Sequence, residues 1–149
     1  MEIYSANSEE EIKECYPAFK ELRPHLSEQE FITQALRQMN NHNYKIVYIK
    51  ANNEVVAASG YRVAEFLAWG KTLYVDDLIT ISSSRNSGYG GALIEWLIKK
   101  ANELACQEFH LDSGPHRHDA HRFYLNTKLN ISSFHFSNEV KKLKSRQVN

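Results

Sequence analysis

The feature that most constrains the fold is a glycine-containing loop between a predicted strand and a predicted helix. Residues 72–82 are rich in β-branched and aromatic side chains, and residues 89–105 place apolar side chains at helical spacing. The sequence joining them is Arg85-Asn86-Ser87-Gly88-Tyr89-Gly90-Gly91. The first N–H groups of a helix have no partner within the helix and lie at the positive end of its dipole. The loop therefore predicts an anion site, where glycines would let a diphosphate approach the backbone.

Two well-known phosphate-binding motifs do not match this loop. A Walker loop would continue with Gly-Lys-Ser or Gly-Lys-Thr, and a dinucleotide fingerprint would have glycine at the position of Asn86. Short glycine motifs also occur in loops that only turn the chain into a helix. The loop by itself leaves the anion site and the simple turn as alternatives.

The rest of the chain predicts a mixed α/β layer fold. Capping boxes at Ser8 and Ser27 begin two amphipathic helices, over residues 8–25 and 27–41. Further strands are predicted at 44–50, 55–63, 109–112 and 131–136, with a turn at Asn52-Asn53 and a helix at 120–128. The predicted order is β-α-α-β-β-β-α-β-α-β, and its late strand–helix–strand unit predicts a parallel pair of strands.

Length and charge narrow the class of protein. A chain of 149 residues fits one domain, and its formal net charge of +0 argues against a general nucleic-acid partner. No apolar run approaches the roughly 18 residues that a membrane span needs, and the sequence begins without the basic flank and apolar run of a signal peptide, so we expect a soluble, unsecreted protein. Cys15 and Cys106 lie far apart in predicted helices, which favours buried thiols in a reducing cytoplasm over a disulfide.

Two blocks of residues resemble those of a known family. Arg85-x-x-Gly88-x-Gly90 is similar to the Gln/Arg-x-x-Gly-x-Gly/Ala signature of the GNAT superfamily of N-acetyltransferases. The run Ala120-His121-Arg122-Phe123-Tyr124 is similar to that family's Ala-x-x-Phe-Tyr. The resemblance is strong over residues 73–136, and the N-terminal helices agree in position and type.

The resemblance implies a fold, a reaction and its partners. The fold would be a single GNAT-like domain over residues 1–149, with a mixed, mostly antiparallel central sheet flanked by helices. The reaction would move the acetyl group of acetyl-CoA to a primary amine, without a metal. We expect direct attack in a ternary complex, because neither Cys15 nor Cys106 has an adjacent histidine that would activate it as a thiolate. The acceptor would be a small molecule or a peptide, with no nucleic acid or membrane involved, and a sheet edge could support a homodimer.

The resemblance also implies roles for particular residues. The backbone of Leu78, Ile79 and Thr80 would bind the pantetheine arm, and the amides of residues 86–91 would bind the diphosphate, with Arg85 bracing the loop. Tyr124 would act as the general acid for the departing thiolate, because a phenol with a pKa of about 10 stays protonated at neutral pH. The alternative for Tyr124 is a tyrosine that only packs in the core.

The general base is less determined than the acid. Asp112 resembles an acidic position that some family members use to deprotonate the amine through water, and Asp76 and Asp77 are rivals. Each of these carboxylates could instead be a solvated strand-end group. The chain departs from the family at Arg117, where asparagine is common, and after the last helix, where Leu129-Asn130 replaces glycine and Asn130 could form a left-handed cap.

Two other functions have some support in the sequence. His110, His116, His118 and His121 lie within twelve residues and resemble, with Asp119 one place early, the histidine run of metal-dependent hydrolases. A non-catalytic acyl-CoA sensor of the same fold is the other alternative. Phe66, Tyr61 and Trp69 could line an acceptor pocket, although aromatic residues in strands more commonly belong to a core or an interface.

Overall fold

The computed structural model describes residues 1–143 of the chain. It divides into two compact units, Met1–Leu111 and Asp112–Asn149, the second being described as far as residue 143. The secondary structure confirms the predicted mixed α/β class with a mostly antiparallel sheet. Within residues 1–143, none of the helices has the length and apolar character needed to cross a bilayer.

The first unit contains the whole sheet and three of the α-helices. Its elements in chain order are β1 (Tyr4–Ser5), α1 (Glu9–Leu22), α2 (Glu28–Asn41), β2 (Tyr44–Ala51), β3 (Glu54–Phe66), β4 (Gly70–Thr80), the 3₁₀ helix η1 (Ser82–Ser84), α3 (Tyr89–Glu103) and β5 (Glu108–Leu111). The strands lie in the order β1-β2-β3-β4-β5. Neighbouring strands are antiparallel except β4 and β5, which are parallel, as the late strand–helix–strand unit predicts.

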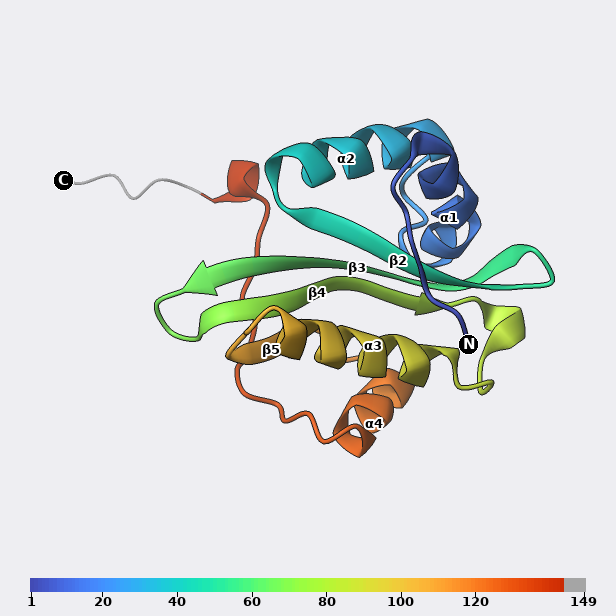
Figure 1. Ribbon diagram of the computed structural model, residues 1–149. Helices are drawn as coiled ribbons and strands as arrows, with labels where there is room; N and C mark the ends of the chain where they lie inside the picture. Colours follow the sequence, from blue (N-terminus) through green and yellow to red (C-terminus); the bar gives the residue numbers. More distant parts are fainter. Residues whose placement is uncertain (144–149) are drawn as a thin grey trace. The chain divides into compact units, whose positions relative to one another are not determined.

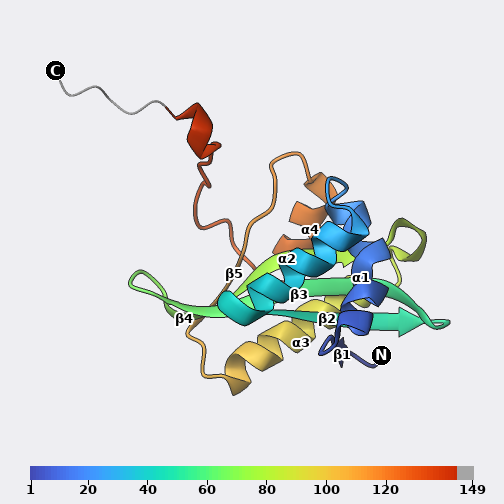
Figure 2. The ribbon, with the colours of Figure 1, turned by 90° about the horizontal axis from the view of Figure 1, so that it is seen from above.

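The sheet of this unit has helices on both faces (Figures 1 and 2), and a hydrophobic cluster lies on each face. The helices α1 and α2 cover one face, where Ile46 and Tyr48 of β2 are buried, and α3 covers the other, where Val47 and Ile49 are buried. Successive side chains of a strand point to opposite faces, so the central strands are apolar on both. The sheet that carries the candidate site is therefore packed on both of its faces.

Local sequence signals determine several element boundaries. The capping boxes are confirmed: the Oγ of Ser8 accepts the N–H of Glu11, and the Oγ of Ser27 accepts that of Glu30. Asn52 and Asn53 form the predicted turn with φ values of +50° and +63°, a left-handed pair typical of two-residue hairpins. These features depend on interactions between residues that are close in the sequence, so the sequence alone predicts them.

The second unit contains α4 (His118–Asn126) and the short 3₁₀ helix η2 (Val140–Lys142). The predicted strand over residues 131–136 is wrong, because these residues form no strand and expose Ile131, Phe134 and Phe136 by 73%, 85% and 92%. β-propensity produces a strand only where a partner pairs with it, and among residues 1–143 the sheet consists of β1 to β5 without this segment. The left-handed residue after α4 is Lys128, with φ +65°, and not Asn130.

The cysteines are both unpaired, and they differ in burial. Cys15 is fully buried in α1, as predicted, whereas Cys106 is only half-buried. The prediction of a buried thiol is therefore wrong for Cys106. That residue follows α3, where the chain leaves the helix before β5, and the side chains of a helix end are covered on fewer sides than those of its middle.

Candidate functional site

The predicted anion loop is a turn that leads directly into the first turn of α3. Gly88 has φ +82°, a left-handed conformation that glycine adopts without the steric cost of a side chain. Its carbonyl accepts the N–H of Ala92 (3.0 Å), and no side chain caps the helix. The N–H groups of residues 89–91 therefore lack partners within the helix, which is the arrangement an anion site requires.

Space around this helix end favours a bound anion as well. A Cβ placed on Gly91 would meet no heavy atom within 4 Å, so the backbone there is open to an incoming group. Asn86, earlier in the loop, also has a left-handed backbone conformation, with φ +63°. The loop thus combines a left-handed turn, which Gly88 permits, with an open helix terminus.

The loop is held at its start by α1. Glu21 accepts two hydrogen bonds from Ser82 through its Oε2, at 2.9 Å from the backbone N and 2.7 Å from Oγ. The side chain of Arg85 is exposed and makes no hydrogen bond or ion pair within residues 1–143. Glu21, which the sequence did not indicate, therefore anchors the segment that leads into the loop, through Ser82.

The strand before the loop has an unpaired stretch on one side. β5 pairs with β4 only over Thr72–Val75, whereas β3 pairs with β4 as far as Thr80. In the described part of the chain, the backbone of Leu78, Ile79 and Thr80 has no strand neighbour on the β5 side. Such an edge can accept an extended ligand as if it were an added strand.

A β-bulge directs two consecutive carboxylates to the same side of the sheet. Gly60 pairs with Asp77 and Tyr61 pairs with Val75, which leaves Asp76 as the extra residue. A bulge changes the direction of a side chain that regular alternation would place on the other face. Asp76 is then bound by the Nε of Arg62, at 2.9 Å from Oδ1, while Asp77 turns toward α1 and α2.

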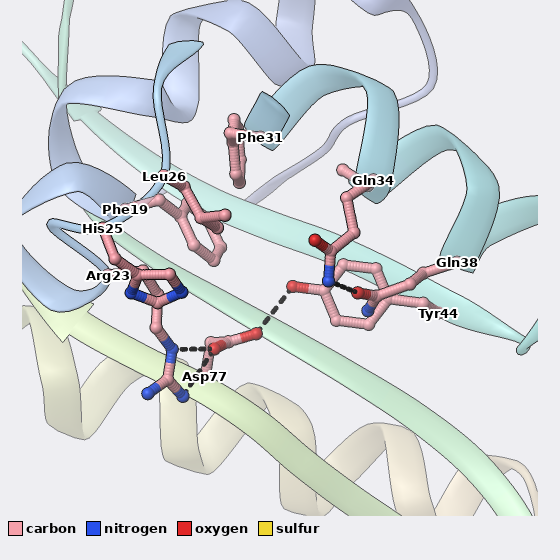
Figure 3. A pocket seen from close by; sticks show the side chains of 10 residues that line it. Phe19, Arg23, His25, Leu26, Phe31, Gln34, Gln38, Tyr44 and Asp77 are labelled. Carbon is pink, nitrogen blue, oxygen red and sulfur yellow. Dashed lines mark hydrogen bonds and ion pairs between the residues drawn. The ribbon is translucent and has the colours of Figure 1, made fainter. Parts of the chain in front are cut away.

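Asp77 forms the floor of a cavity of about 320 Å³ between the α1–α2 pair and the sheet (Figure 3). Its Oδ1 accepts the Nε of Arg23 at 2.9 Å, and its Oδ2 accepts the hydroxyl of Tyr44 at 2.8 Å. Other residues that line the cavity are Phe19, His25, Leu26, Phe31, Gln34, Ala35 and Gln38. The cavity combines apolar walls with a polar floor, which is typical of small-molecule sites.

Tyr44 reaches Asp77 only because the neighbouring strand has a glycine. A Cβ on Gly60 would lie 1.9 Å from the Oη of Tyr44 and 2.4 Å from its Cζ. Burial raises the pKa of Tyr44 well above its ordinary value, and the negative charge of Asp77 raises it further. The hydroxyl therefore remains a proton donor to the carboxylate at every physiological pH.

In the second unit, Tyr124 lies on α4 and Asp112 directly follows β5. Tyr124 is half-buried, and this burial raises its pKa while the charge of Arg117 opposes the rise. Arg117 is the N-cap residue of α4, so this departure from the family pattern acts electrostatically on Tyr124. The Asp112 side chain is 47% exposed, with Oδ1 at 3.5 Å from the Nδ1 of His135.

The histidines of the second unit do not form a metal-binding arrangement. The Nε2 of His121 is hydrogen-bonded to the carbonyl of Gly114 (2.8 Å), and the rings of His118 and His121 lie 6.4 Å apart, edge to face. Among residues 1–143, no group of three or more His, Cys, Asp and Glu side chains is placed to hold a metal ion.

The predicted aromatic acceptor residues of the first unit have other neighbours. Tyr61 is buried against Trp96 of α3, and Trp69 stacks on His110 with ring centroids 3.9 Å apart. Neither residue lines the cavity above Asp77, and neither does Phe66.

Sequence reasoning missed the cavity because its residues are distant along the chain. Arg23 is 54 positions from Asp77, and Tyr44 is 33 positions from it. Two signals were nevertheless present: a pair of aspartates inside a predicted strand, and a glycine in the middle of the neighbouring strand. Glycine at such a position indicates a bulge or a close approach.

Comparison with known proteins identifies the family. The model of the Acetyltransferase (GNAT) family matches residues 7–127. The chain belongs to this family. The GNAT match includes the loop, the β4 edge, the cavity residues and Tyr124.

Relatives of this GNAT protein agree with the assignment. The uncharacterized N-acetyltransferase YhdJ of Bacillus subtilis (strain 168) is 29% identical over 134 residues, which cover 89% of this chain and 94% of YhdJ. A transcriptional regulator of Bacillus halodurans C-125 has the same fold, with a TM-score of 0.82 at 19% identity and coverage of 93% and 98%. AAC(6')-Iy, solved with a bisubstrate analogue of coenzyme A, gives a TM-score of 0.80 at 11% identity over 93% and 97% of the two chains. The two solved structures establish the GNAT fold alone.

Proposed function

We propose that this GNAT protein transfers the acetyl group of acetyl-CoA to a primary amine by direct attack in a ternary complex. The observation that favours this most is the uncapped N-terminus of α3 behind left-handed Gly88, next to an unpaired stretch of β4. A coenzyme with a diphosphate and an extended amide-containing arm matches both features. The similarity to an N-acetyltransferase over 89% of the chain supports the same reaction.

The first unit would supply the binding groups for acetyl-CoA, which brings an acyl thioester to the site. The backbone of Leu78, Ile79 and Thr80 would hydrogen-bond the pantetheine arm along the open edge of β4. The amides of Asn86, Ser87, Gly88, Tyr89, Gly90 and Gly91 would hold the diphosphate. Arg85, whose guanidinium is exposed beside these amides, would brace the loop once phosphate oxygens are present, and Glu21 would keep the loop in place throughout.

The second unit would supply the acid and the base. Tyr124 would donate its hydroxyl proton to the sulfur of the departing thiolate, and its raised pKa keeps that proton in place at neutral pH. Asp112, nearly half-exposed, would accept the proton of the amine through water. Asp76 and Asp77 are the weaker candidates for the base, because arginine side chains already bind both carboxylates.

The proposal extends to the cellular context. Residues 1–149 would act as one acetyltransferase domain, without a metal, on a small-molecule or peptide amine. The two unpaired cysteines fit a reducing compartment, and we propose the cytoplasm. A homodimer through a sheet edge is part of the same proposal, whereas nucleic acid and membrane have no role in it.

A thiol-release assay with acetyl-CoA and a panel of primary amines tests this function. We expect release of free thiol that depends on the amine and matches the acetylated product by mass spectrometry, unchanged by a metal chelator. Binding of acetyl-CoA without release for any amine would favour the sensor, and failure to bind it would overturn the proposal. Loss of activity with the chelator would revive the metal-dependent alternative.

A further inference from the structure

The cavity above Asp77 has no negative charge available for a cationic ligand. Oδ1 of Asp77 receives both Nε and Nη2 of Arg23, at 2.9 Å and 2.8 Å, and Oδ2 receives the hydroxyl of Tyr44. The neighbouring carboxylate of Asp76 is bound by the guanidinium group of Arg62. The two carboxylates are thus matched by two guanidinium groups, and an ammonium group would have to displace Arg23 from Asp77.

Hydrogen-bond donors, in contrast, are available in the cavity. Nη1 of Arg23 and the ring of His25 make no hydrogen bond or ion pair within residues 1–143, although both residues line the cavity. On the opposite side, Nε2 of Gln34 donates to Oε1 of Gln38 at 3.0 Å (Figure 3), and the Gln38 amide N–H groups donate to no group of the described residues. The polar part of the cavity is therefore suited to a group that accepts hydrogen bonds and is negatively charged.

The remaining wall is apolar and aromatic. Phe19 and Phe31 pack with their ring centroids 4.8 Å apart, and Leu26 lies beside them. A volume of about 320 Å³ is at the small end of the range for ligand pockets. Such a space suits a compact molecule with one apolar group and one anionic group.

We propose that this cavity binds the carboxylate and side chain of an α-amino acid with an apolar side chain, as the acetyl acceptor. The inference rests on the proposed acetyltransferase function and specifies its substrate class. The carboxylate would bind Nη1 of Arg23 and the ring of His25, and the apolar side chain would pack on Phe19 and Phe31. Asp77, at the floor, directly precedes Leu78, so the ligand would lie beside the strand segment assigned to acetyl-CoA.

Calorimetric titration with three amines tests this substrate class without turnover, because it uses coenzyme A in place of acetyl-CoA. L-Phenylalanine has the proposed carboxylate, L-phenylalaninamide has the same shape without the charge, and spermidine is a polycation. We expect phenylalanine to bind about tenfold or more tightly than its amide, since hydrogen bonds to a charged acceptor are the stronger ones. Spermidine should not bind measurably in this cavity.

Variants connect that binding to the cavity. Ala35 is buried in the cavity wall, so Ala35→Leu should fill the space and abolish phenylalanine binding, and His25→Ala should weaken it several-fold. His42→Ala removes an exposed histidine that does not line the cavity and should leave the affinity unchanged. Circular dichroism identifies a misfolded variant. If Ala35→Leu is misfolded, His25→Ala still tests the cavity, because it removes a side chain that makes no hydrogen bond within residues 1–143.

The outcomes separate the substrate class from the transferase function. Equal binding of acid and amide, tighter binding of spermidine, or unchanged affinity in His25→Ala would overturn the cavity assignment. Acetylation of spermidine without binding of phenylalanine would leave the transferase function intact and reject this substrate class. Phenylalanine binding that depends on His25, with no thiol release, would support the cavity assignment and reject the transferase function.

Discussion

The two units of this protein are stabilised to different extents. Every fully buried side chain of the described chain belongs to Met1–Leu111, and its polar groups pair across distant elements, as Arg23 and Asp77 do. Among residues 112–143 of the second unit no residue is fully buried, and the side-chain hydrogen bonds of α4 are local, for example from Arg122 to Asp119. A helix as short as α4, with nine residues, is marginal in water by itself.

The proposed functions are divided along the same boundary. The residues proposed to bind acetyl-CoA, and the cavity, lie in the strongly packed unit, whereas Tyr124 and Asp112 lie in the weakly packed one. Binding needs preformed groups, because each group that is ordered on binding lowers the affinity. Binding of acetyl-CoA and the chemical step should therefore respond to different substitutions.

Tyr124→Phe should have the largest effect, and it should act on chemistry alone. The change removes only the hydroxyl, so turnover should fall by roughly 10²- to 10⁴-fold, the contribution of a lost general acid. Affinity for acetyl-CoA, measured by calorimetry, should stay unchanged because the binding groups are in the first unit. Unaltered turnover with a good acceptor would show that Tyr124 is only structural.

Gly88→Glu, in contrast, should weaken the binding of acetyl-CoA. A left-handed conformation costs a side chain about 1–2 kcal/mol, and a carboxylate at an anion site adds like-charge repulsion of several kcal/mol. We therefore expect affinity for acetyl-CoA to fall by at least roughly 100-fold in calorimetric titration. Gly88→Asn is the matched control, since asparagine tolerates this conformation and adds no charge. Its affinity for acetyl-CoA should fall by no more than about tenfold. Unchanged affinity in Gly88→Glu would show that the loop does not bind the coenzyme.

A third pair of variants compares the packing of the two units directly. Gly60→Ala would push the Tyr44 ring away from Asp77, and overpacking of this kind costs about 1–3 kcal/mol. In a chain of this length each kcal/mol lowers Tm by roughly 2–4 °C. Phe134→Ala changes a side chain that is 85% exposed and should alter stability by no more than about 0.5 kcal/mol. A comparable loss for Phe134→Ala in thermal unfolding would mean that the exposed side chains of residues 131–136 are covered in solution, for example by a second copy.

Local chemistry explains what the sequence could predict. The starts of α1 and α2 follow from Ser8 with Glu11 and Ser27 with Glu30, and the β2–β3 turn follows from two asparagines. Each feature involves groups within four positions of one another. The same holds for the start of α3, where Gly88 immediately before an apolar helical pattern indicates a helix end without a side-chain cap.

Long-range packing explains what the sequence could not predict. The bulge at Asp76 depends on pairing between β3 and β4, and regular alternation would have placed Asp76 and Asp77 on opposite faces. The cavity needs Arg23 and Tyr44 to meet a carboxylate dozens of positions away. Residues 131–136 show the opposite error, because their composition is strand-like although they form no strand.

The smallest effect is expected from removing both cysteines, which tests whether the acetyl group passes directly to the amine. Burial raises the pKa of Cys15 to about 12, so its thiol stays protonated at neutral pH and is a poor nucleophile. Cys106 is half-buried at the end of α3, away from the proposed binding loop at the helix start. The Cys15→Ala, Cys106→Ala variant should therefore keep its turnover within about twofold, whereas loss of a covalent nucleophile removes several orders of magnitude.

Intact-mass measurement of the wild-type protein after incubation with acetyl-CoA is the direct check on this last prediction. Direct transfer leaves no acetyl group on the protein, because the thioester carbon bonds to the amine nitrogen as the bond to sulfur breaks. An acetylated cysteine together with a folded but inactive double variant would establish a covalent route instead. The single variants would then separate buried Cys15 from Cys106. Cys106 would be the stronger candidate, since a nucleophile must be reachable by the thioester and Cys15 is fully covered by the core of the first unit.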